Sequence, residues 1–285
     1  MDRIELLESQ IAKLSDRLDS IERKIEYISS TAGHPVEILL QQYGFPVITH
    51  GSPVQLIFSP NIPSALLSNF YSMMRRYSFR LFMRELIQAP ESNDFERLAR
   101  YCSLKTVKSY LEILAAMGIV AFDGVGYKLI RKVPSFGRTL EWYVCEILKR
   151  EFLSPALFNV KLRNTKVGGD YDVVSVIAGH LAYIEVKSSP PRGVEHPAVE
   201  AFLGRIEDLD PAISILFVDT ELRMSDKLVP LLAEGLKSKG KSDPDWAVTR
   251  LVNEIFHVRN HIYVTNSRKG IYSNLRICFR NFFTG

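Results

Sequence analysis

The sequence predicts a mixed α/β domain in its C-terminal half and an α-rich N-terminal half. Three observations predict this organisation. From residue 134 onward, candidate elements follow in the order helix, three strands, helix, strand. Residues 62–133 show helical periodicity that ends in a short hairpin pattern, and residues 4–28 carry an unbroken heptad repeat. A chain of 285 residues has room for two such domains.

The stretch from Gly168 to Pro191 contains the β-hairpin around which the C-terminal domain is organised. Residues 172–177 and 181–186 are β-rich runs, and Ala178-Gly179-His180 between them supplies the turn. We therefore expect two antiparallel strands here.

Charged residues lie at the open end of this hairpin. Side chains alternate along a strand, so Glu185 and Lys187 share one face while Val186 points to the other. Asp172 opens the first strand where Glu185 and Lys187 close the second. Burying a carboxylate without a partner is costly, so these groups need a counter-charge, a metal or water. Two carboxylates and a lysine favour a divalent cation, and oxygen ligands suit Mg²⁺ or Mn²⁺.

Asp172, followed after the hairpin by Ile184-Glu185-Val186-Lys187, resembles the signature of the PD-(D/E)XK nuclease superfamily. The similarity is to its restriction-endonuclease-like and archaeal Holliday-junction-resolvase-like branches, and it covers residues 134–285. It implies a restriction-endonuclease-like α-β-β-β-α-β core and a Mg²⁺- or Mn²⁺-dependent DNA endonuclease. Tyr171 departs from the family pattern, because the family usually has proline before its first acid.

The family also has a helix before the hairpin that contributes a further acid. Residues 138–151 are a helix candidate with Leu140, Val144, Ile147 and Leu148 on one apolar face. Glu141 lies near this face and is the preferred helix acid, with Glu146 as second choice. The resemblance thus implies a metal site and a lysine that orients water or stabilises the transition state: the ligands Asp172, Glu185, Glu141 and the carbonyl of Val186, and the lysine Lys187.

Two alternatives stay open at this site. Asp170 competes with Asp172, since alternation places both on the same face. A second function class is a DNA-binding regulatory or structural protein whose nuclease-like domain is catalytically silent. The intact acidic pair and lysine favour the enzyme, because a scaffold has no need of charges on a buried strand.

The remaining elements of this domain are expected on either side of the hairpin. We expect a strand over 157–163 before it. After it we expect helices over 195–208, 225–238 and 244–257, and strands over 213–219, 260–265 and 274–279.

Residues 62–133 are expected to begin with a helix over 62–87. Its arginines, Arg75, Arg76, Arg80 and Arg84, are expected on solvated faces. Residues 81–132 then resemble a winged helix-turn-helix, with helices over 95–102 and 104–117 and a two-stranded wing over 119–130.

In such modules the third helix enters the major groove of DNA. The resemblance implies DNA contacts from exposed residues of this helix and of the wing: Lys105, Thr106, Lys108, Ser109, Lys128, Arg131 and Lys132. Many modules of this kind instead serve as protein-interaction or dimerisation units, and that alternative stays open.

Residues 1–30 are predicted to form a coiled coil. Its apolar heptad positions are Ile4, Leu7, Ile11, Leu14, Leu18, Ile21, Ile25 and Ile28. We expect a parallel homodimer through this segment, which would bring two active sites to a duplex. The alternative is an amphipathic helix docked on its own globular body. Residues 31–61 are expected to be a connector with short ordered pieces.

Composition bounds the function further. The hydrophobic content of 46% and charged content of 24% are typical of a globular protein. The three cysteines form no CxxC pair, which argues against a zinc site or a disulfide framework. There is no apolar leader, no apolar stretch long enough for a membrane span and no P-loop, so we expect a cytoplasmic protein without a membrane partner.

The net charge of +4 is mild, but it is unevenly distributed. No acidic residue follows Glu254, whereas the last 31 residues contain five basic ones: Arg259, Arg268, Lys269, Arg276 and Arg280. This segment either lies against phosphates or forms core elements with basic outer faces.

Overall fold

The computed structural model describes residues 10–11, 13–15, 17–18, 20–21 and 33–285. Most of the predicted coiled coil therefore lies outside the described residues. Those described between 10 and 21 are helical, and their apolar side chains at Ile11, Leu14, Leu18 and Ile21 are exposed. The homodimer stays a prediction.

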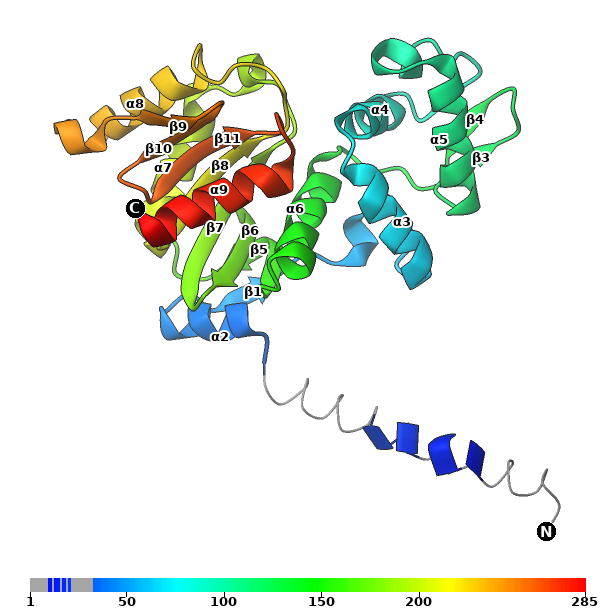
Figure 1. Ribbon diagram of the computed structural model, residues 1–285, viewed down its shortest axis with the longest axis horizontal. Coiled ribbons are helices and arrows are strands. Elements are labelled where there is room, and N and C mark those ends of the chain that lie inside the picture. The colour runs from blue at the N-terminus through cyan, green and yellow to red at the C-terminus, as the bar shows by residue number, and fades with distance from the viewer. Residues whose placement is uncertain (1–9, 12, 16, 19, 22–32) are drawn as a thin grey trace.

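The C-terminal half is built on an eight-stranded sheet with the strand order β1-β5-β6-β7-β8-β11-β10-β9 (Figure 1). The predicted order of helix, three strands, helix and strand is present. Its elements are α6 (Gly137–Glu151), β5 (Ala156–Leu162), β6 (Asp170–Ile177), β7 (His180–Lys187), α7 (His196–Leu209) and β8 (Ile213–Val218).

Strand directions place the candidate site at the end of the sheet where its parallel strands finish. β6 and β7 pair antiparallel, whereas β7, β8 and β11 (Ile262–Asn266) run parallel. Lys187, Val218 and Asn266 end these three strands in mutual register. The start of β6 lies at the same end because β6 runs the opposite way. We call this end of the sheet the carboxyl edge.

Helices cover both faces of the sheet (Figure 1). One core gathers apolar residues of α6 and α9 (Ile271–Thr284), such as Leu140 and Leu275. The opposite core takes residues from α2 (Pro35–Gln42), α7 and α8 (Leu228–Ser238), such as Leu40, Phe202 and Leu232. Among the described helices, none is both long and apolar enough to cross a membrane.

Two expected elements near the C-terminus were wrong. Residues 244–257, expected as a helix, form one 3-10 turn, η4 (Pro244–Trp246), and the hairpin β9 (Thr249–Val252) and β10 (Ile255–Val258). Their β-branched residues favour strands, and Asn253 takes the positive φ of 51° that the turn needs. Residues 274–279, expected as a strand, lie within α9. The spacing of Ile271, Leu275 and Cys278 buries one helical face.

The N-terminal half is helical with a small sheet. It contains α3 (Ser64–Met74), α4 (Tyr77–Gln88), η2 (Leu98–Tyr101) and α5 (Leu104–Ala116), and the strands β2 (Glu91–Ser92), β4 (Tyr127–Leu129) and β3 (Val120–Phe122) pair in that order. The expected helix over 95–102 is thus only a 3-10 turn. Ser103 caps α5 by accepting a hydrogen bond from the Thr106 amide at 3.2 Å.

The helix expected over 62–87 is broken at Arg75 and Arg76. Arg80 stabilises the break, because its Nη1 donates to the carbonyls of Met74 at 2.7 Å and Arg75 at 3.3 Å. These carbonyls are among those that a helix end leaves without partners.

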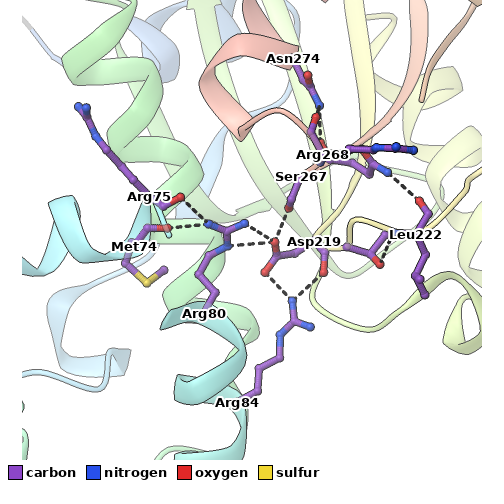
Figure 2. Close-up of polar contacts among 11 residues, drawn as sticks. Met74, Arg75, Arg80, Arg84, Asp219, Leu222, Ser267, Arg268 and Asn274 are labelled. Carbon is purple, nitrogen blue, oxygen red and sulfur yellow. Dashed lines mark hydrogen bonds and ion pairs between the residues drawn. The ribbon is translucent and has the colours of Figure 1, made fainter. Parts of the chain in front are cut away.

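Arg80 and Arg84 do not lie on solvated faces, which corrects our expectation. Arg80 donates to Asp219 through Nε at 3.0 Å and Nη2 at 2.8 Å, and Arg84 donates to the other carboxylate oxygen and to the Asp219 carbonyl. Ser267 also donates to Asp219. Figure 2 shows the two arginines of α4 converging on this one aspartate. The Asp219 and Arg80 side chains are only 0% and 2% exposed. Arg75 and Arg76, by contrast, are exposed.

Part of the expected connector belongs to the sheet. β1 (Val47–Thr49) pairs antiparallel with β5, and Val47 lies opposite Leu162. α2 packs Val36 and Leu40 under the same sheet. The chain therefore leaves the sheet after β1, forms the helical half, and rejoins the C-terminal domain at α6.

Candidate active site

The β6–β7 hairpin brings three of the expected site residues together at the carboxyl edge. Lys187 Nζ lies 2.6 Å from Glu185 Oε1. The backbone amide of Val186 donates to Asp172 Oδ2 at 2.8 Å, so Asp172 is tied across the hairpin to the strand that carries the other two. The motif residues therefore form one constellation.

Glu185 is buried, with a residue exposure of 1%. Beside Lys187 it has two further partners that the sequence reading did not identify. Arg205 Nη1 lies 3.2 Å from Oε1 and 3.0 Å from Oε2, and the Tyr183 hydroxyl donates to Oε2. The alternation of side chains along a strand could have identified Tyr183, because it precedes Glu185 by two residues and therefore lies on the same face. Arg205 comes from α7. The sequence indicates only that a buried carboxylate needs a basic partner, and it does not indicate which residue that partner is.

Burial and neighbouring carboxylates raise the proton affinity of two acids of the site, Asp172 and Glu141. Burial, followed by the charges of Glu185 and Glu141, raises the pKa of Asp172 well above 3.8, although the Val186 amide and Lys187 oppose the shift. Burial also raises the pKa of Glu141, and the charge of Glu185 adds to this, while Arg138 lowers it. The site therefore gathers carboxylates in a partly desolvated place, where basic side chains supply the counter-charge.

Arg138 links Glu141 to the competing acid Asp170. Its Nη1 lies 2.8 Å from Glu141 Oε2, and its Nη2 lies 2.8 Å from Asp170 Oδ2. Glu146, the second choice for the helix acid, instead pairs with two basic residues of α6 itself, Lys149 and Arg150. Glu141 is thus the acid of α6 whose charge is felt at the hairpin.

Asn159 on β5 is a further residue that sequence reasoning missed. It is buried, it has a positive φ of 50°, and its Nδ2 donates to Gln55 Oε1 at 3.0 Å. Its Oδ1 has no hydrogen-bond partner among the described residues. An unpaired buried oxygen is unusual, and this one lies on the strand paired with β6.

The donor chemistry of the hairpin end fits a hard divalent cation. Among the described residues, no group of three or more His, Cys, Asp or Glu side chains lies close enough to share a metal ion. The candidate ligands at this end of the hairpin, the carboxylates of Asp172 and Glu185 and the carbonyl of Val186, nevertheless supply only oxygen, which Mg²⁺ and Mn²⁺ prefer. Burial, followed by the charges of Glu185 and Glu141, raises the pKa of Asp172, and a bound cation would lower it again.

The residues expected to contact DNA fall into two groups. Lys105, Lys108 and Ser109 are exposed on the first turns of α5, with Thr106 half-buried beside them. In the expected wing, Lys128 pairs with Glu91 at 3.0 Å, and Lys132 after the wing is exposed. Arg131 instead donates to the carbonyls of Val54 and Phe58, so it holds the chain before α3.

Comparison with known proteins identifies the fold alone. No family model matches the chain, and no curated protein matches it either. The chain is similar in fold to protein VC1899. This protein from Vibrio cholerae superposes with a TM-score of 0.52 at 15% identity, over 87% of this chain and 62% of that one. This chain thus spans less than two thirds of the length of VC1899. Can2 from Sulfobacillus thermosulfidooxidans, solved in complex with cyclic tetra-adenylate, gives a TM-score of 0.48 at 12% identity, over 89% of this chain and 63% of that one.

Proposed function

We propose that this chain is a metal-dependent DNA endonuclease of the PD-(D/E)XK type. One observation carries the proposal: Asp172, Glu185 and Lys187 meet at the carboxyl edge of a sheet in the helix, three-strand, helix, strand order that the sequence resemblance implies. Ligands of open α/β sheets bind at this edge.

Each site residue then has a role set by its position. Asp172, Glu185 and the Val186 carbonyl would hold Mg²⁺ or Mn²⁺, and Glu141 of α6 is a further candidate ligand. Such a bound ion lowers the pKa of its water and polarises a phosphate oxygen. The Lys187 ammonium, half-buried beside Glu185, stabilises negative charge on the phosphate. Arg205 and Tyr183 hold Glu185 in one orientation.

The proposal is tested by incubating the full chain with linear, forked, flapped and four-way-junction DNA in the presence of Mg²⁺, Mn²⁺ or Ca²⁺. Cleavage with Mg²⁺ or Mn²⁺ supports it, and the preferred DNA names the substrate. Binding of DNA without cleavage in either metal overturns it.

Metal binding can be measured separately from DNA cleavage, through its effect on thermal stability. Mg²⁺ at about 100 times its dissociation constant should stabilise the wild type by about 2.7 kcal/mol, because it binds only the folded state. Asp172→Asn should abolish this Mg²⁺-dependent rise in Tm, measured by differential scanning fluorimetry. An equal rise in both proteins would place the ion elsewhere.

A catalytically silent domain is the second candidate, and Arg205 favours it. Its guanidinium lies within 3.2 Å of both oxygens of Glu185, where a cation would otherwise contribute the counter-charge. If the site is silent for this reason, Arg205→Met should gain a Mg²⁺-dependent rise in Tm that the wild type lacks. The enzyme proposal requires that rise in the wild type.

We further propose that α5 positions the DNA and that the N-terminal heptads form a homodimer. Lys105 and Lys108 are exposed at the start of α5, as a helix in the major groove requires. Two sites in one dimer would cut both strands of a duplex. Sedimentation equilibrium of the full chain tests the dimer through its mass.

A further inference from the structure

A groove runs between the N-terminal half and the carboxyl edge of the sheet. It consists of two adjoining cavities of about 480 and 530 Å³. One wall comes from α4 and η2, and the other comes from the loops after β7 and β8. The two cavities share the lining residues Leu81, Arg84, Tyr101, Pro190 and Arg192.

Two segments that line this groove continue along the chain into elements of the candidate active site. Ser188 and Ser189, which line the first cavity, follow Lys187 in the chain. Residues 134–136 line it from the other side and lead into α6, which carries Glu141. A strand whose phosphate reaches the hairpin end would therefore extend along this groove.

The first cavity carries unneutralised positive charge. Arg84 is paired with Asp219, and Glu85 is paired with Arg97. Arg100 and Arg192 are exposed and have no ion-pair partner within the described part of the chain. Among the described residues, the one acid of the groove without an ion-pair partner is Glu221, which lines only the second cavity. Phosphates are thus attracted to the first cavity.

Tyr101 supplies an aromatic surface beside these charges. Its exposure is 42%, which is high for a large aromatic residue, and the guanidinium of Arg100 lies 5.4 Å from its ring centre. Phe136, the other aromatic residue of the first cavity, is buried and covered by Arg84. An exposed ring next to phosphate-binding arginines is the arrangement that stacks unpaired bases.

The buried cluster of Arg80, Arg84 and Asp219 holds the two walls together. Both arginines come from α4, and Asp219 directly follows β8 (Figure 2). The Asp219 amide also donates to the Lys187 carbonyl at 2.8 Å, which ties the wall to the candidate site. The groove is therefore preformed, and little conformational entropy is lost when a ligand enters it.

We propose that this groove binds a single-stranded segment of DNA, with Arg100 and Arg192 on its phosphates and Tyr101 stacked on a base. The inference rests on the proposed nuclease function and names the form of its substrate near the site. It is separate from the α5 surface, which the resemblance assigns to duplex DNA.

The test is binding of a labelled 12-nucleotide single strand to the full chain, by fluorescence anisotropy in EDTA at several salt concentrations. Arg100→Ala/Arg192→Ala should weaken binding about tenfold or more and reduce the slope of log K against log salt by about 1.4, since each phosphate contact to a single strand contributes about 0.7. Tyr101→Ala should weaken binding about tenfold and leave the slope unchanged.

Arg276→Ala/Arg280→Ala is the matched control. It removes two exposed arginines from α9, none of whose residues lines either cavity. It should keep affinity and salt slope within about twofold. Equal losses in the control would show a general charge effect and overturn the proposal. So would unchanged binding in the groove variants, or an equal loss for a duplex of the same sequence.

Measuring binding in EDTA tests the groove independently of the proposed nuclease activity. EDTA removes catalysis, so a silent site leaves the binding result intact. Conversely, if the wild type cleaves DNA and the groove variants bind the single strand as tightly as the wild type does, only the proposed role of the groove is refuted. The altered side chains are exposed, so circular dichroism should show folded variants.

Discussion

Glu185→Gln should reduce metal-dependent cleavage by about 100- to 1,000-fold while DNA binding is retained. The substitution keeps the size of the side chain and removes the charge that a divalent ion needs. Charge stabilisation by a catalytic metal is worth several kcal/mol, and each 1.36 kcal/mol corresponds to a factor of ten. Glu185 is buried at the hairpin end, so the loss of its charge is screened little by water.

Glu200→Gln is the matched control for this experiment. Glu200 is exposed on α7, and its one ion-pair partner among the described residues is His196 at 3.5 Å, so the same change in charge occurs outside the contacts of Asp172, Glu185 and Lys187. Its cleavage rate should stay within about twofold of the wild type. Rates are measured in single-turnover reactions with protein in excess, which separates chemistry from binding. Full activity in Glu185→Gln would remove this residue from the mechanism.

Asp219→Asn should lower the free energy of unfolding by about 3–5 kcal/mol. Removing one partner of a buried ion pair leaves the other charge uncompensated, and here two arginines depend on one carboxylate. The Ser267 hydroxyl would lose a charged acceptor as well. Urea denaturation at pH 7 measures the difference, and Glu207→Gln serves as the surface control. Glu207 pairs with Lys239 and Lys241 in solvent and should cost at most about 1 kcal/mol.

The pH dependence of this difference follows from the pKa of Asp219. Burial alone would raise that pKa, but Arg80 and Arg84 outweigh it and hold the pKa below 3.8. The unfolded state therefore binds the proton more readily than the folded state. The stabilisation is complete above the unfolded value of 3.8 and is lost as the pH falls toward the lower folded value. The advantage of the wild type should shrink below this pH, and a constant difference would contradict the assignment.

The sequence predicted the elements whose pattern is local. The hairpin was readable because β-rich runs flank an Ala-Gly-His turn, and α6 because its apolar residues recur at helical spacing. The same reasoning fails for residues 244–257, where the pattern predicts one helix but Asn253 separates two short β-branched strands. Periodicity alone distinguishes short strands from helices poorly.

Tertiary partners were beyond the reach of local patterns. Arg80 lies on an amphipathic helix at a position that looks solvated, and only packing of α4 against the end of β8 buries it. Arg205 is likewise one of several charged residues on α7, and its contact with Glu185 depends on how that helix crosses the sheet. The constellation of Asp172, Glu185 and Lys187 was accessible because all three residues belong to one hairpin.

The pairing of β1 with β5 has a consequence for how this protein is made. Val47 and Leu162 are neighbours in the sheet, although the whole helical half lies between them in the sequence. Closing so long a loop is slow unless its ends are already held near each other. During synthesis the helical half emerges before β5, so its early collapse would hold β1 beside the start of α6 until the rest of the sheet arrives.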